Sequence, residues 1–181
     1  MPFRRFFERR RRERAATSLY LRVVEQARLP VFYASYGVAD TLEARFDMIL
    51  VHAWLVLHRL GKVQSEPSKA LSQATFDLMF ADMDRNLREM GVTDLRVGKR
   101  VQRMAEAFYG RAGAYDKALE EGADALAAAL ARNLYQGEAV SAGHLTAMAT
   151  YIIRQTAHLD GQADQSLLDG NVSFQLPEER A

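Results

Sequence analysis

The 181-residue sequence contains no cysteine. Disulfide bonds, zinc sites built from thiolates and cysteine nucleophiles are therefore all excluded. The absence is typical of proteins from reducing compartments.

The sequence also lacks an apolar run long enough to cross a membrane. Its most apolar stretch is 46–57, which is interrupted or flanked by Arg45, Asp47, His52 and His58. A membrane-spanning helix needs about 20 predominantly apolar residues, so we interpret this stretch as a buried core helix. The N-terminal residues lack the apolar core of a secretory signal as well.

Residue patterns typical of catalysis or metal binding are missing too. No Glu-x-x-His pair, glycine-rich phosphate loop or nucleophile elbow occurs. His52 and His58 would lie on different faces of one helix, and we expect both as polar tips at the margin of the core. His144 and His158 are too far apart along their helix to share an ion. We therefore expect no enzyme, no metal, no cofactor, no small-molecule substrate and no DNA partner.

Helical periodicity dominates the sequence and is clearest between Leu71 and Tyr115, where two apolar stripes have α-helical spacing. The first stripe consists of Phe76, Met79, Phe80, Met83, Leu87 and Met90, and the second of Val97, Val101, Met104, Ala105, Phe108, Ala112 and Tyr115. Gly91 offers a left-handed stop between them, and Asp94 is placed to cap the second helix. So short a connection predicts an antiparallel hairpin with facing stripes, which bury Phe76, Phe80, Met83, Leu87, Val101, Met104 and Phe108 together.

Other periodic segments predict helices at 17–28, from an Asp40 cap to about Arg59, at 123–135 before Gly137, and after a Ser141 cap. Residues 31–38 have no helical period, so we expect a loop there. No segment is typical of a strand. The sequence thus predicts an all-α fold, a single compact bundle of about six helices built on the central hairpin. Its expected parts are a basic N-terminal arm (1–16), an all-α domain (17–161) and a polar C-terminal tail (162–181) extended over the bundle.

Positive charge is concentrated at the N-terminus, although the net charge of the whole chain is only +1. The arm carries Arg4, Arg5, Arg9, Arg10, Arg11, Arg12 and Arg14 against two glutamates. Such a cluster suits an anionic membrane surface or ribosomal RNA. The alternative is a solvated, partly frayed start to the first helix.

A second basic feature lies in the hairpin. Lys99, Arg100, Arg103 and Arg111 are expected on the side of their helix away from the apolar stripe. This basic stripe is a candidate surface for a client, a partner subunit or RNA. An ordinary solvated helix face is the competing interpretation.

Two blocks of the sequence resemble a known family. ATFDLMFADMD (74–84), NLREMGV (86–92) and the stretch from VGKRV to MAEAFYGR (97–111) form one block, and residues 36–55, beginning YGVADTLEARFDM, form the other. Both blocks are similar to the ubiquinol–cytochrome c chaperone family, whose bacterial and mitochondrial members are assembly factors of the cytochrome bc1 complex. The chain resembles the bacterial type.

The resemblance implies a helical protein that binds newly made cytochrome b and supports its haem acquisition and its incorporation into the bc1 complex. It also implies a small helical partner protein and a place near the ribosome, as in mitochondrial relatives. We expect a cytoplasmic location, or one at the inner face of the cytoplasmic membrane, or the mitochondrial matrix in a eukaryote. A ribosome- or RNA-binding adaptor acting through the basic arm is the alternative function, and an enzyme or haem carrier built on a helical bundle is a third hypothesis.

Overall fold

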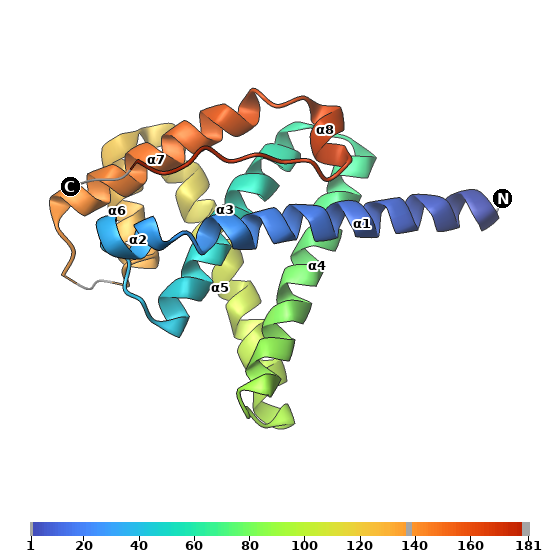
Figure 1. The fold of residues 1–181 in the computed structure, drawn as a ribbon, viewed down its shortest axis with the longest axis horizontal. Helices are drawn as coiled ribbons and strands as arrows, with labels where there is room; N and C mark the ends of the chain where they lie inside the picture. Colours follow the sequence, from blue (N-terminus) through green and yellow to red (C-terminus); the bar gives the residue numbers. More distant parts are fainter. Residues whose placement is uncertain (1, 137–138, 179–181) are drawn as a thin grey trace.

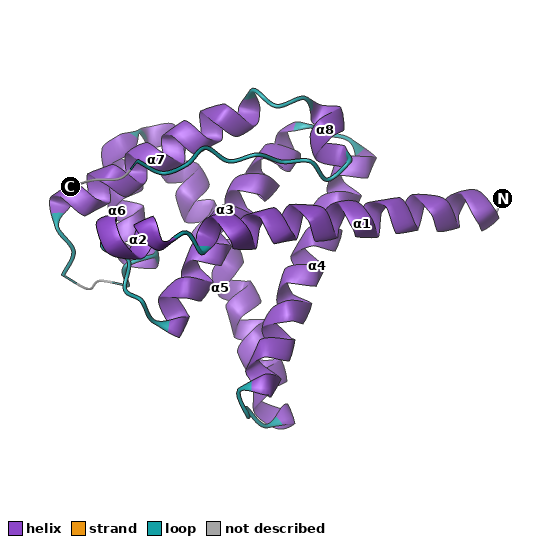
Figure 2. Ribbon diagram, viewed as in Figure 1, coloured by secondary structure: helices purple, strands orange, loops and turns teal. Residues whose placement is uncertain are grey.

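The computed structural model describes residues 2–136 and 139–178, without the side chains of residues 2–5, 94 and 95. Within these ranges the chain forms eight helices and no strand (Figure 2). They are α1 (Pro2–Ala27), α2 (Pro30–Ser35), α3 (Leu42–Lys62), α4 (Glu66–Glu89), α5 (Asp94–Glu121), α6 (Ala123–Asn133), α7 (Ala142–Asp160) and α8 (Asp164–Leu168). Because α2 and α8 have only six and five residues, six longer helices remain, and the predicted all-α bundle of about six helices is confirmed.

Helix α3 lies at the centre of the fold and packs against α1, α4, α5 and α7. Every side chain from Asp47 to Val56 is buried. Because several helices surround α3, it is apolar on nearly all sides rather than along one stripe. This explains the apolar run 46–57 and confirms its interpretation as a buried core helix.

Two local predictions before α3 are wrong. Thr41, not Asp40, caps the helix, and its side chain accepts a hydrogen bond from the backbone N–H of Ala44. Asp40 instead forms an ion pair with Arg45. Part of the expected loop 31–38 is helix α2, because Pro30 at its first turn pre-sets a helical φ without losing a needed donor.

The predicted hairpin is confirmed as α4 and α5, which pack against each other around a left-handed Gly91 (φ +80°). Thr93 occupies the N-cap position of α5 and Asp94 is the first helical residue, which corrects the predicted cap. Phe80, Met83, Leu87 and Phe108 are buried as predicted, whereas Phe76, Val101 and Met104 are only partly buried. For Val101 and Met104, in the first turns of α5, the reason is that the far end of the hairpin projects from the body with only two helices present there (Figure 1).

Helix α1 runs without a break through the predicted arm and the predicted helix 17–28. Its first buried residues are Ala15 and Ala16, and the end of α1 that precedes them extends beyond the body (Figure 1). Gly170 touches α1 at this point, because a Cβ on Gly170 would lie only 2.6 Å from the Ala15 Cα. Gly170 also has a φ of +86°, so this close approach requires glycine for two reasons.

The segment after α7 folds back across the molecule. Short helix α8 comes first, and residues 171–178 then lie extended beside α7 and α1 (Figure 1). The carbonyl of Gln175 accepts hydrogen bonds from Gln26 of α1 and Gln155 of α7. Of the helix-end signals in the preceding part of the chain, Ser141 caps α7 as predicted, while Gly137 lies outside the described residues.

Candidate functional site

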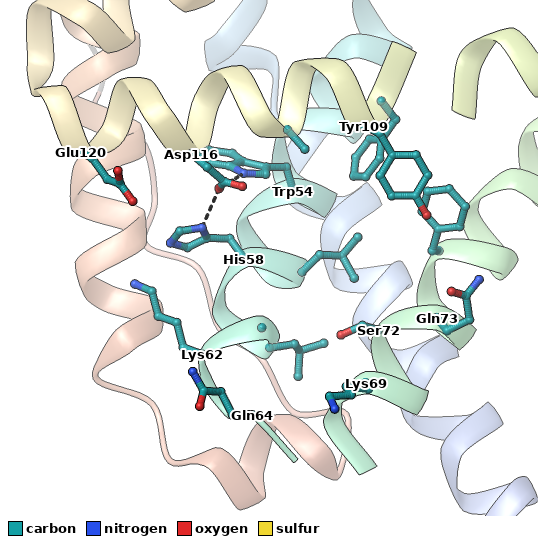
Figure 3. A pocket seen from close by; sticks show the side chains of 16 residues that line it. Trp54, His58, Lys62, Gln64, Lys69, Ser72, Gln73, Tyr109, Asp116 and Glu120 are labelled. Atoms are coloured by element: carbon teal, nitrogen blue, oxygen red, sulfur yellow. Dashed lines mark hydrogen bonds and ion pairs between the residues drawn. The ribbon is translucent and has the colours of Figure 1, made fainter. Parts of the chain in front are cut away.

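An open cleft of about 980 Å³ lies between α3, α4 and α5 (Figure 3). Its apolar lining is Trp54, Leu57, Leu60, Phe76, Phe108, Tyr109 and Ala112. Polar side chains at its edges are His58, Lys62, Gln64, Lys69, Ser72, Gln73, Asp116 and Glu120. We call this feature the aromatic cleft.

The aromatic cleft exists because α4 and α5 meet at the hairpin end and separate toward the body (Figure 1). Phe76 of α4 contacts Phe108 and Tyr109 of α5 across the cleft wall, with ring centroids 5.6 and 5.1 Å apart. Tyr109 is 60% exposed although it belongs to this ring cluster. The cleft thus offers aromatic surface that no other part of the described chain covers.

Asp116 of α5 contacts two residues of α3 at the base of the cleft. Its Oδ1 accepts a hydrogen bond from Trp54 Nε1 at 2.8 Å and lies 2.7 Å from His58 Nδ1 (Figure 3). The second ring nitrogen of His58, Nε2, is covered by protein and has no hydrogen-bond partner among the described residues. These contacts tie α5 to α3, so the cleft has a rigid base.

The charges at the rim are largely compensated. Lys62 pairs with Asp160, and Lys69 pairs with Glu66. In the part of the chain that the structure describes, no three His, Asp or Glu side chains converge as metal ligands. The aromatic lining and the polar side chains at the edges suit the cleft to an apolar surface with polar edges.

His52 is placed differently from the prediction. It is fully buried rather than at the margin of the core, with Nδ1 2.8 Å from the Met48 carbonyl and Nε2 2.8 Å from the Tyr151 hydroxyl. Burial lowers the pKa of His52 to about 4, although the hydrogen bond with Met48 acts in the opposite direction. Since no solvent reaches it, His52 is part of the core and not of a site.

The structure separates the four residues of the predicted basic stripe. Lys99, Arg100 and Arg103 are exposed near the start of α5, but Arg111 forms an ion pair with the buried Asp47 of α3. The other carboxylate oxygen of Asp47 accepts a hydrogen bond from Gln136. Burial raises the pKa of the Asp47 carboxyl, while the Arg111 charge opposes that rise. Arg111 therefore joins the hairpin to the body and does not share a surface with the other three.

Arg96 joins the three remaining cations. We call Arg96, Lys99, Arg100 and Arg103 the basic tip; they line a shallow depression that also includes the exposed Met90. No ion pair to a carboxylate is found for these four among the described residues. The sequence could have indicated Arg96, because it precedes Lys99 and Arg100 by one helical turn.

The arginines of the arm have mixed surroundings. Arg9 pairs with Glu13 and Arg11 pairs with Asp169, whereas Arg10 lies over the ring of Phe6. No ion pair is found for Arg12 or Arg14 within the described chain, and the side chains of Arg4 and Arg5 lie outside it. None of the described helices is both long and apolar enough to span a membrane.

Comparison with known proteins gives consistent similarities. The profile of a family described as Ubiquinol-cytochrome C chaperone matches residues 34–174. Human ubiquinol-cytochrome c reductase complex assembly factor 1 is 28% identical over 88% of this chain and 54% of its own length. The mitochondrial protein CBP3 of Saccharomyces cerevisiae is 25% identical over 81% of this chain and 44% of its own length. The chain thus spans about half the length of these curated relatives.

A solved structure is similar over nearly the whole chain. The crystal structure of the Cbp3 homolog from Brucella abortus superposes with a TM-score of 0.84 at 35% identity, covering 97% of each chain.

Proposed function

Because the chain belongs to the ubiquinol–cytochrome c chaperone family, we propose that it is an assembly chaperone for the bc1 complex that holds newly made cytochrome b. The names of its relatives describe assembly factors of ubiquinol-cytochrome c reductase, which supports the assembly role. The assignment of cytochrome b as the client is the finer part of the proposal. We place this role at the inner face of the membrane into which cytochrome b is inserted.

The observation that carries this proposal is the exposed aromatic surface of the cleft. A membrane protein shows apolar surface to water before it is inserted, at a cost of about 25 cal/mol per Å². The exposed Tyr109 and the partly exposed Phe76 offer a place to cover such surface, with the buried Phe108 behind them. An amphipathic helical segment of the client fits this arrangement, since helices dock in grooves through apolar residues spaced three and four apart.

The basic tip supplies a second contact in this proposal. It projects from the body, so a client loop or a small helical partner protein reaches it without competing with the cleft (Figure 1). Lys99, Arg100 and Arg103 contact the client or partner together with Arg96, whereas Arg111 stabilises the fold through its ion pair with Asp47.

The aromatic cleft is tested by Tyr109→Glu. The side chain is exposed, so the variant should keep the helical spectrum and the melting temperature of the wild type. A charge among the rings should lower the amount of cytochrome b that copurifies with the protein, and the level of assembled bc1 complex, by about tenfold or more.

The matched control is Leu176→Glu, which adds the same charge at an exposed apolar residue outside the cleft lining. It should capture cytochrome b like the wild type. If Tyr109→Glu bound as much cytochrome b as the wild type, the aromatic cleft would not be the client-binding surface. Absence of cytochrome b from wild-type preparations would contradict the proposal itself.

A further inference from the structure

The projecting end of α1 is helical and continues the part of α1 that packs on the body. Packing on α3 and α4 sets the direction of α1 where it leaves the body, and the contact between Gly170 and Ala15 and the ion pair between Arg11 and Asp169 add to it. The helix continues unbroken toward Pro2 from that point. Residues 6–14 therefore extend away from the core along the axis of α1.

Two large apolar side chains stand at this projecting end. Phe6 is 49% exposed and Phe7 is 67% exposed, and their rings meet edge to face at 6.0 Å. Neither ring joins the hydrophobic core. Adjacent exposed phenylalanines on one helix indicate an interaction surface rather than random exposure.

The exposed apolar residues share one side of α1 with arginines. Phe7, Arg10, Arg14 and Leu21 follow one another at intervals of three, four and seven residues, which places them on one face. The buried side of the same helix is formed by Leu19 and Val23, on the opposite face. The body therefore does not block the face that carries Phe7 and Arg10.

The charge on this segment favours an anionic partner. Five arginines lie between residues 9 and 14, accompanied by Glu13. Arg10, Arg12 and Arg14 have no carboxylate partner among the described residues, and Arg10 lies 4.7 Å above the Phe6 ring centre. Arginine beside aromatic rings is typical of helices that lie in the interface of a membrane.

We propose that residues 6–14 of α1 are an interfacial anchor for an anionic lipid bilayer, in which Phe6 and Phe7 enter the headgroup region while Arg10 and Arg14 bind lipid phosphates. RNA offers the same phosphates, but a purely electrostatic contact with its backbone would leave both phenylalanines in water. A bilayer accommodates the rings and the charges at once. The proposal goes beyond the assembly function and does not depend on it, because lipid binding is measured with the isolated protein.

Cosedimentation of the full chain with vesicles tests the anchor. The wild type should bind vesicles that contain phosphatidylglycerol and not vesicles of phosphatidylcholine alone. Each arginine near an anionic surface contributes about fivefold in affinity, so Arg10→Gln with Arg14→Gln should weaken binding about 25-fold. Lys117→Gln with Arg132→Gln removes the same charge from other exposed positions and should bind like the wild type.

The phenylalanines separate a lipid anchor from a general polyanion site. Phe6→Ser with Phe7→Ser keeps every charge and should weaken binding to the anionic vesicles about tenfold. It should leave the fluorescence of Trp54 unchanged, since that buried residue reports the fold of the body. Wild-type affinity of this variant for vesicles would overturn the proposal, as would binding of the wild type to ribosomal RNA but not to vesicles at the same salt.

Insertion can also be observed directly. Phe7→Trp should give a fluorescence signal that brominated lipids quench, while Trp54 remains unquenched inside the body. If the tryptophan at position 7 stays unquenched on bound vesicles, the rings do not enter the bilayer and the proposal is wrong.

Discussion

Leu55 in the body and Leu87 near the hairpin end are equally buried, at 1% exposure each, but their surroundings differ. Leu55 lies in α3, which has four helices around it, whereas Leu87 is outside the main core cluster, at the end where only α4 and α5 pack together. A leucine buried to the same degree therefore belongs to a closed core in one region and to a thin two-helix layer in the other. The candidate binding features lie where the layer is thin or splayed.

The joint between the two regions should be the most sensitive point. Arg111→Met leaves the buried Asp47 without its cation, and breaking a buried ion pair in this way costs about 3–5 kcal/mol. Chemical denaturation of the purified protein would measure the loss. Arg103→Met on the exposed part of α5 is the control and should change stability by less than about 0.5 kcal/mol. A loss below about 1 kcal/mol for Arg111→Met would mean that the pair does not hold the hairpin to the body.

A matched pair of truncations sharpens the comparison within the core. Leu55→Ala should cost about 4 kcal/mol, because the rigid surroundings of α3 leave a cavity. Leu87→Ala should cost only about 2 kcal/mol, since two helices can close around a gap more easily. Denaturation midpoints of both variants measure the two losses in the free energy of unfolding. Equal losses would show that the hairpin end is packed as firmly as the body.

Acid should destabilise the body through His52. The folded-state pKa is about 4, below the value of about 6.5 for an exposed histidine, so the unfolded chain binds the proton more readily. Stability should therefore fall as the pH drops, by about 2 kcal/mol between pH 7 and pH 5 from this residue. The raised pKa of Asp47 acts in the opposite direction, so the wild type must be compared with His52→Gln. If His52→Gln showed the same pH dependence of stability as the wild type, His52 would not be the cause of the acid destabilisation.

The smallest expected effect on stability belongs to the basic tip. Arg100→Glu with Arg103→Glu changes two solvated side chains and should shift stability by less than about 1 kcal/mol in total. The same change should lower assembled bc1 complex in cells if the tip meets a client or partner, because like charges across an interface cost several kcal/mol. Lys117→Glu with Arg132→Glu provides the equal charge change elsewhere. Normal bc1 levels in the Arg100 and Arg103 variant would identify the tip as an ordinary solvated face.

The helical hairpin and the buried α3 could be predicted from sequence because both depend on local periodicity. The site could be predicted only in part. Lys99, Arg100 and Arg103 were placed on an exposed face by helical spacing, whereas Arg111 was misplaced because its partner Asp47 lies in another helix. A helical wheel gives the direction of a side chain but not what stands opposite it.

The aromatic cleft is a second feature that helical periodicity alone does not predict. Phe76 and Phe108 are predicted to be buried together; their rings do meet, but the splay of α4 and α5 leaves Phe76 only partly buried. The angle between two helices depends on a third, since Asp116 of α5 is held by Trp54 and His58 of α3. The predicted helix 17–28 is shorter than α1 for a different reason. Arginine has a high helix propensity, so the helix extends through the basic arm although no apolar stripe is present there.

Close contact of Gly170 with Ala15 also bears on the order in which the protein can fold. The adjacent ion pair between Arg11 and Asp169 joins residues 158 positions apart, so the segment that carries Asp169 leaves the ribosome long after α1 itself. Contacts over such separations form late, because the chain between them must first be brought together. During synthesis α1 can pack on α3 and α4 before residues 169 and 170 emerge, and its contact with Gly170 is added when the segment after α7 docks on it. The contacts that complete the packing around Ala15 therefore form only after the segment following α7 has been synthesised.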